Sequence, residues 1–343
     1  MNRNDQNGYV LRLVEIASSG ATLTGDLCFS CGGQPTAGQG EHVIPKWLQK
    51  RFGLANERVT LLNGTFLPYR SLTVPCCTDC NNGFLRNIEN SIVEVIANPS
   101  VDLAAYRLRF AQWMCKIFIG LLVKEKALPF DRRYPEKGSI APTDILEEFM
   151  HAQLVLQSAR KETVFHALHG DFPFSLYLYR VVPDRFCGDF DLSTHIGGQS
   201  IAIRVGEVGA IFVNDGGLQM EVGAKGPFGL AGKELHPIQF AEVAARVHYK
   251  ASLRDATHSY VSSETPEVLT IDQSAVRPYT NITFDDGAQR IFKPWDDVEC
   301  ASFIERYRNI DWGTVYEPST GLFSSTLMDE DGALPNPRSF RKS

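Results

Sequence analysis

The chain has 343 residues, 43% of them hydrophobic and 22% charged, with a formal net charge of −6 and a pI of about 5.8. This composition is that of an ordinary globular protein that is long enough for two domains. The acidic balance excludes a nucleic-acid binder that relies on a basic field over its whole surface. Any polyanion must therefore be bound by a local basic patch.

The N-terminal residues 1–19 contain no apolar core of the signal-peptide type. The most apolar stretch, Met114–Val123, is too short to span a bilayer and is interrupted by Lys116. We therefore expect a cytoplasmic protein without a membrane partner. In a reducing compartment, paired cysteines indicate metal binding more often than disulfides.

The order of expected elements predicts the α+β class, in four segments. Residues 1–19 are a lead segment, and 20–98 are a small module that holds five of the eight cysteines. Residues 99–323 are a larger α+β domain with an antiparallel sheet and several helices, and 324–343 are a flexible tail.

Within the small module, short strands are expected at 43–45, 59–62 and 72–74. Apolar residues then recur at helical spacing, which predicts a helix that starts at or just after Cys80.

In the larger domain, helical patterns occupy residues 101–128, 143–161 and 236–254, and Thr143 is the expected N-cap of the second. Between about 164 and 222, strand patterns alternate with glycine-rich turns, which predicts an antiparallel meander.

Two C-x-x-C pairs predict one tetrahedral zinc site, formed by Cys28, Cys31, Cys77 and Cys80. Cys76 leaves a second register open, but Cys77 repeats the spacing of the first pair. Four thiolates leave no open position for a substrate. This zinc ion is therefore expected to be structural.

Between the two pairs lies the stretch GEHVIPKW, residues 40–47. This stretch contains an acid, a histidine, two apolar residues and a proline, and a C-x-x-C pair and Asn81 follow it. The pattern resembles the motif of the HNH endonuclease family. That family has the ββα-metal, or His-Me finger, fold, here in its zinc-stapled form. The resemblance covers about seventy residues, from Cys28 to about Ile96.

The resemblance implies a metal-dependent endonuclease that cleaves DNA or, alternatively, RNA. By motif position, His42 would activate the attacking water. Glu41 and Asn81 would hold one Mg²⁺ or Mn²⁺ ion, and Asn82 replaces Asn81 if the helix register differs by one. A neutral imidazole suits the first task, and a divalent ion with oxygen ligands suits the second.

The chain departs from the family pattern at two places. Asn81 stands where many members have the third histidine of the motif. The stretch RSLTVPC before the second cysteine pair contains no asparagine to orient the histidine. Asn63 could take that role only if a longer loop brings it back.

The motif region is locally basic. From His42 to Arg86 it holds six basic residues against two acidic ones, a net charge of +4. These cations could neutralise phosphates independently of base sequence. The basic residues are Lys46, Lys50, Arg51, Arg58, Arg70 and Arg86.

Two other functions remain open at this point. The same zinc fold could bind nucleic acid or a protein without cleaving anything, which the missing middle asparagine favours. It could also be an interaction scaffold that makes no contact with nucleic acid. In the endonuclease reading, the larger domain selects the substrate or regulates access, with a regulatory protein or a second copy of the chain as a partner. A role in phage defence would fit by analogy alone.

Overall fold

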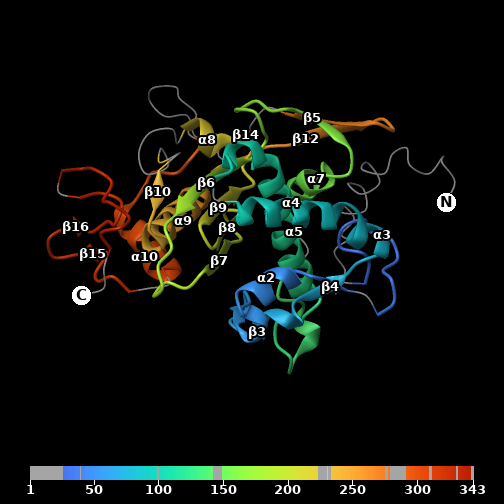
Figure 1. Ribbon diagram of the computed structural model, residues 1–343, viewed down its shortest axis with the longest axis horizontal. Helices are drawn as coiled ribbons and strands as arrows, with labels where there is room; N and C mark the ends of the chain where they lie inside the picture. The colour runs from blue at the N-terminus through green and yellow to red at the C-terminus, as the bar shows by residue number, and fades with distance from the viewer. Residues whose placement is uncertain are drawn as a thin grey trace. The chain divides into compact units, whose positions relative to one another are not determined.

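The computed structural model describes residues 26–38, 40–98, 100–141, 149–222, 230, 233–274, 277–278, 291–308, 311–329 and 331–340. The chain divides into two compact units (Figure 1). Unit 1 comprises Met1–Val95, Leu108–Val164 and Tyr260–Asp272, and unit 2 comprises Ile96–Arg107, Phe165–Ser259 and Gln273–Ser343. Residues 108–164 thus belong with the cysteine-rich module. The mixture of helices and antiparallel sheets confirms the predicted α+β class.

Unit 1 contains three small sheets and a long buried helix. Strand β1 pairs antiparallel with β4, β2 with β3, and β13 lies between β12 and β5. The strands are β1 (Gly40–His42), β2 (Arg58–Thr60), β3 (Phe66–Pro68), β4 (Thr73–Pro75), β5 (Glu162–His166), β12 (Tyr260–Glu264) and β13 (Val268–Gln273). The helices are α2 (Lys46–Arg51), η3 (Leu54–Asn56), η4 (Tyr69–Ser71), α3 (Thr78–Cys80), η5 (Asn81–Leu85), α4 (Arg86–Ala97), α5 (Arg107–Lys126), η7 (Pro135–Lys137) and α7 (Met150–Gln157).

The helix predicted after Cys80 is present as α4, which α3 and η5 precede, and Gly83 interrupts the helical geometry within η5. The strand expected at 43–45 is shifted: β1 ends at His42, because Pro45 turns the chain into α2. The expected N-cap Thr143 lies outside the described residues. None of the described helices combines the length and the apolar character that a membrane crossing requires.

Unit 2 is built on a five-stranded sheet with the order β10-β6-β9-β8-β7. Helix α9 packs on it through a core that includes Tyr179, Phe240 and Val247. The strands are β6 (Ser175–Val181), β7 (Phe190–His195), β8 (Ser200–Val205), β9 (Val208–Val213), β10 (Glu234–Leu235), β11 (Ala256–Thr257), β14 (Arg277–Pro278), β15 (Tyr316–Glu317) and β16 (Leu322–Phe323). The helices are η6 (Leu103–Tyr106), α8 (Leu218–Val222), α9 (Pro237–Ser252) and α10 (Asp297–Tyr307).

The predicted meander is only partly correct. Strands β7, β8 and β9 follow one another as neighbours, but β6 pairs with β9 and not with β7. Strand β5 belongs to a different sheet. Strand β6 is buried along most of its length and lies second in the sheet, where the short β10 pairs only with Arg180 and Val181, whereas the half-buried β7 lies at the edge. In the segment expected to be a flexible tail, Thr326 is hydrogen-bonded through its backbone and hydroxyl to the buried carboxylate of Glu242.

The buried His248 and the half-buried His195 should make unit 2 acid-labile. Burial lowers the pKa of His248 to about 3, with His195 adding to the shift, and lowers that of His195 to about 4. Both rings are uncharged in the folded state, so below pH 6.5 the unfolded chain binds more protons. The stability that depends on them is present above pH 6.5 and is lost as the pH falls.

We expect these two rings to lower the free energy of unfolding of unit 2 by about 3 kcal/mol between pH 7.5 and 5.5. Urea denaturation at a series of pH values measures this. The His248→Asn variant should lose about half of this contribution, because one of the two titrating rings is gone. An unchanged slope in that variant would exclude His248 as a source of the effect.

Candidate functional site

Four cysteines of unit 1 come together as a group able to bind a metal ion. The sulfur atoms of Cys28, Cys31, Cys77 and Cys80 all lie within 4.8 Å of one another. The Cys31 and Cys77 sulfurs are 3.7 Å apart, close to the edge of about 3.8 Å in a tetrahedral site with metal–sulfur bonds of about 2.3 Å. The group contains Cys77 and not Cys76, which confirms the predicted register.

The first cysteine pair sits in a tight turn that the following glycines make possible. The carbonyl of Cys28 accepts hydrogen bonds from the backbone N–H groups of Cys31 and Gly32, and Gly32 has a φ of 66°. The N–H of Gly33 then donates to the Cys31 sulfur over 3.4 Å. This geometry holds the first two sulfurs within one turn.

Polar side chains from a distant part of unit 1 support the cysteine group, and the sequence pattern did not reveal them. The side-chain amides of Gln153 and Gln157 donate to the backbone carbonyl of Ser30, over 3.1 and 2.7 Å. The Arg160 guanidinium donates to the Cys80 sulfur over 3.1 Å and stacks on Phe84. A positive donor at this sulfur stabilises its thiolate.

Strands β1 and β4 carry the motif residues next to this cysteine group. Glu41 lies opposite Val74 and His42 opposite Thr73, and β4 leads directly into Cys76 and Cys77. Between β1 and β4 the chain forms α2, η3, β2, β3 and η4, and α3 follows β4.

Glu41 is buried in an ion pair that the motif did not predict. Its Oε1 atom lies 2.5 Å from the Nζ atom of Lys116, and its side chain is 11% exposed. Lys116 also contacts Glu89 Oε1 over 2.7 Å and donates to the backbone carbonyl of His42 over 2.8 Å. Burial lowers the pKa of Lys116, but the two carboxylates outweigh it and raise the pKa above the usual value. The lysine is therefore charged.

His42 is partly buried, and its imidazole makes no hydrogen bond within the described part of the chain. Burial, followed by the charges of Lys46 and Lys116, lowers its pKa below 6.5. The ring is therefore neutral at neutral pH and can accept a proton. The following residue, Val43, packs against Gly120 of α5, so the end of β1 rests directly on the buried helix.

The asparagines considered for the motif differ in their exposure and in their hydrogen bonds. Asn81 is half-buried and Asn82 exposed, and in the described residues neither side chain makes a hydrogen bond. They begin η5, where Gly83 leaves helical geometry with φ −92° and ψ −118°. The Asn63 side chain is used in the turn after β2, where it accepts from Thr65 and donates to the Phe130 carbonyl.

The structure does not gather Glu41, His42 and a third histidine, cysteine or acid into one metal-binding group; among the described residues, such groups occur only at the four cysteines and in unit 2. Lys116 already occupies Glu41 Oε1, and the Glu41 carboxyl group also interacts with that of Glu89. Glu41 and the Asn81 side chain have oxygen atoms of the type that Mg²⁺ and Mn²⁺ bind, but no contact between the two side chains occurs among the described residues.

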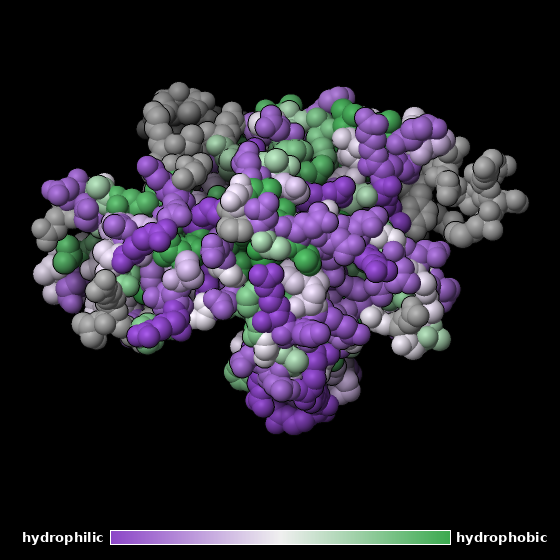
Figure 2. Space-filling view, in the orientation of Figure 1, coloured by the Kyte–Doolittle hydropathy of each residue, from purple (hydrophilic) through white to green (hydrophobic). Residues whose placement is uncertain are grey.

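All six predicted phosphate-contacting cations are exposed. Three lie on α2, and the others lie on β2, on η4 and at the start of α4. The surface over α2 and β3 is predominantly hydrophilic (Figure 2). Trp47, in contrast, stacks on Trp113 of α5 with ring centroids 6.4 Å apart, so it serves packing.

The group in unit 2 consists of Asp184, Cys187 and His236. His236 caps helix α9: its Nδ1 atom accepts a hydrogen bond from the N–H of Ile238 over 3.2 Å. The ring proton is then on Nε2, 3.4 Å from Asp184 Oδ2, so no lone pair on that nitrogen faces a cation. This group serves the structure of the loop and the helix start.

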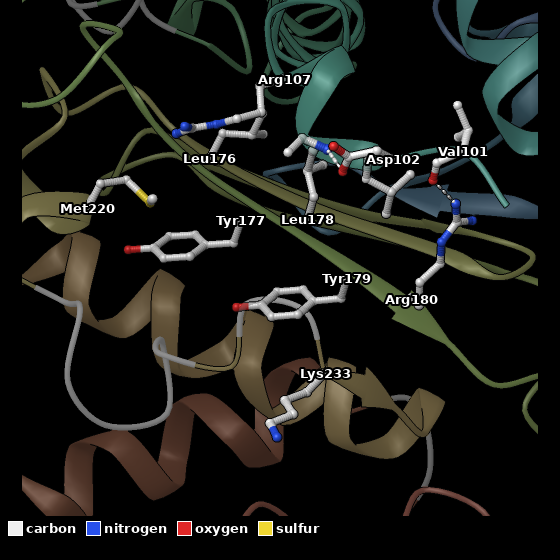
Figure 3. A pocket seen from close by; sticks show the side chains of 12 residues that line it. Val101, Asp102, Arg107, Leu176, Tyr177, Leu178, Tyr179, Arg180, Met220 and Lys233 are labelled. Carbon is white, nitrogen blue, oxygen red and sulfur yellow. Dashed lines mark hydrogen bonds between the residues drawn. The ribbon is translucent and has the colours of Figure 1, made fainter. Parts of the chain in front are cut away.

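Unit 2 also contains a pocket of about 450 Å³ along β6 (Figure 3). Two of its polar side chains are engaged in local structure: Arg180 donates to the Val101 carbonyl, and Asp102 caps η6. The hydroxyl of Tyr179 is buried and has no hydrogen-bond partner in the described residues. None of the predicted site residues lines this pocket.

Comparisons with protein-family models, with curated proteins and with solved structures found no match.

Proposed function

We propose that the N-terminal part of unit 1 is a metal-dependent endonuclease of the HNH type that hydrolyses phosphodiester bonds, with DNA as the preferred substrate and RNA as the alternative. The observation that carries this proposal is His42. Its imidazole is partly exposed, uncharged and without a hydrogen bond in the described chain, on a strand next to a four-cysteine group.

His42 is suited to be the general base. It takes a proton from the water that attacks phosphorus, which requires an imidazole that is neutral before the reaction. The depressed pKa meets this requirement. The Lys116 hydrogen bond to the His42 carbonyl and the β1–β4 pairing hold its backbone, so the ring approaches the substrate from a fixed position.

The proposed metal ions have separate tasks. The four cysteines would hold Zn²⁺, which joins the first turn to the start of the helix. Glu41 Oε2 and the Asn81 side chain would hold one Mg²⁺ or Mn²⁺ ion, with Asn82 as the alternative. When bound, this ion supplies the positive charge that the pentavalent phosphate and the departing oxygen require.

The six exposed cations of the motif region would bind the phosphate backbone. They are spread over α2, β2, η4 and the start of α4, so they offer several phosphate contacts without reading the bases. Binding should therefore weaken steeply as salt concentration rises.

One observation favours a second candidate, a nucleic-acid binding module that does not cleave. The Glu41 carboxylate that should ligate the catalytic ion is already paired with Lys116. If this ion pair prevents metal binding, the zinc fold and the basic surface remain and catalysis is absent.

A cleavage assay distinguishes the two candidate functions. The full chain is incubated with supercoiled plasmid in the presence of Mg²⁺ or Mn²⁺. Metal-dependent nicking that EDTA stops supports the endonuclease. Salt-sensitive binding of duplex DNA without nicking of DNA or RNA supports the binding module. A chain that neither binds nor cleaves nucleic acid would exclude both and leave a protein-interaction scaffold.

A further inference from the structure

The ammonium group of Lys116 has the surroundings of a bound cation. Three oxygens face its Nζ atom: Glu41 Oε1 at 2.5 Å, Glu89 Oε1 at 2.7 Å and the His42 carbonyl at 2.8 Å. The side chain is 1% exposed. It therefore has no access to a substrate, and its side-chain contacts among the described residues are with these three groups.

A charged lysine is unusual in the apolar sequence that surrounds this position. Lys116 lies in the middle of α5, between the buried residues Cys115 and Ile117. A buried charge is tolerated only when it is paired and hydrogen-bonded. Two carboxylates and one ammonium leave a formal charge of −1 if both acids are ionised. Burial raises the pKa of Glu89, which favours a protonated second acid and a balanced cluster.

The same three oxygens could serve a metal ion. Two carboxylate oxygens and a backbone carbonyl around one point are the ligand types that Ca²⁺ and Mn²⁺ take, at about 2.3–2.6 Å for Ca²⁺. A lysine ammonium differs from such an ion in carrying one charge and in being covalently attached. The attached cation cannot be lost by dilution or removed by a chelator.

We propose that Lys116 is a built-in cation, which fills a divalent-cation position between Glu41 and Glu89 and so makes the shape of this site independent of metal. The position differs from that of the proposed catalytic ion, which would use Glu41 Oε2 and not Glu89. The inference therefore does not rest on the chain being a nuclease.

Substitution of Lys116 by methionine should turn the cluster into a divalent-cation site. We expect the zinc-loaded, full-length Lys116→Met protein to bind one Mn²⁺ ion at least ten times more tightly than the wild type, measured by the loss of free Mn²⁺ signal in electron paramagnetic resonance. The matched control, Lys116→Met with Glu89→Gln, should lose this site. Glu89→Gln alone should leave any weak wild-type site unchanged.

The variant can also fail to fold without a cation. In that case, added Mn²⁺ or Ca²⁺ should restore its circular dichroism spectrum and raise its melting temperature, while the double variant should not respond in this way. A Lys116→Met protein that is folded but binds Mn²⁺ no more tightly than the wild type overturns the proposal. One that stays unfolded at millimolar Mn²⁺ and Ca²⁺ overturns it as well.

Discussion

Replacing Cys77 by alanine is expected to release one zinc ion and to unfold the N-terminal part of unit 1, whereas replacing the adjacent Cys76 should do neither. Cys77 belongs to the four-cysteine group and Cys76 does not. Structural zinc binding contributes about 10–16 kcal/mol in zinc-finger peptides at pH 7. This contribution is as large as the total free energy of unfolding of a typical domain, about 5–15 kcal/mol.

The neighbouring pair is a sharp control because both thiols lie close to the same partners. Cys76 is buried, and its sulfur is 3.9 Å from that of Cys28. Zinc content by mass spectrometry of the purified proteins gives the first readout. Near-ultraviolet circular dichroism gives the second, because the stacked Trp47 and Trp113 rings report on unit 1. Loss of zinc in the Cys76 variant alone would show that the other register is used.

The four-cysteine group could be predicted because each half is local. A C-x-x-C pair fits into one turn, so spacing alone selects Cys77 over Cys76. The helix after Cys80 was predictable for a similar reason, since Ile88, Ile92 and Val95 recur at helical spacing and are buried.

The partner of Glu41 could not be predicted, because it comes from a different part of the chain. Lys116 lies 75 positions later, inside the apolar stretch Met114–Val123 of α5. The single charged residue in that stretch was the available signal, because a buried lysine needs an acid close to its ammonium group. Sequence periodicity shows that Lys116 is buried, but it does not identify which carboxylates it meets.

The predicted strand order of unit 2 was partly wrong for a related reason. The local patterns of β6 to β9 were recognisable, yet their order depends on which strand is covered on both faces. Leu176 and Tyr177, adjacent residues on opposite faces of β6, are both buried. Strand β6 pairs with β9 from Ser175 to Arg180 and with the short β10 only at Arg180 and Val181, and β7 lies at the other edge.

The second large effect concerns catalysis: we expect His42→Ala to lower the rate of plasmid nicking by about 10²–10⁴-fold, the usual contribution of a general base. The imidazole makes no hydrogen bond in the described chain, so its removal should cost little stability. Thr73→Ala is the matched control, because Thr73 lies opposite His42 on β4 and both side chains are half-buried.

Comparing the two variants distinguishes a loss of proton transfer from a loss of structure. Both variants should keep one zinc ion and bind duplex DNA with the same salt dependence as the wild type, because neither touches the cysteines or the exposed cations. Nicking should be lost in the His42 variant and kept in the Thr73 variant. Equal nicking by His42→Ala and the wild type would remove His42 from the mechanism. Loss of nicking in both, with zinc and binding retained, would assign the effect to the geometry of the β1–β4 pair and not to proton transfer.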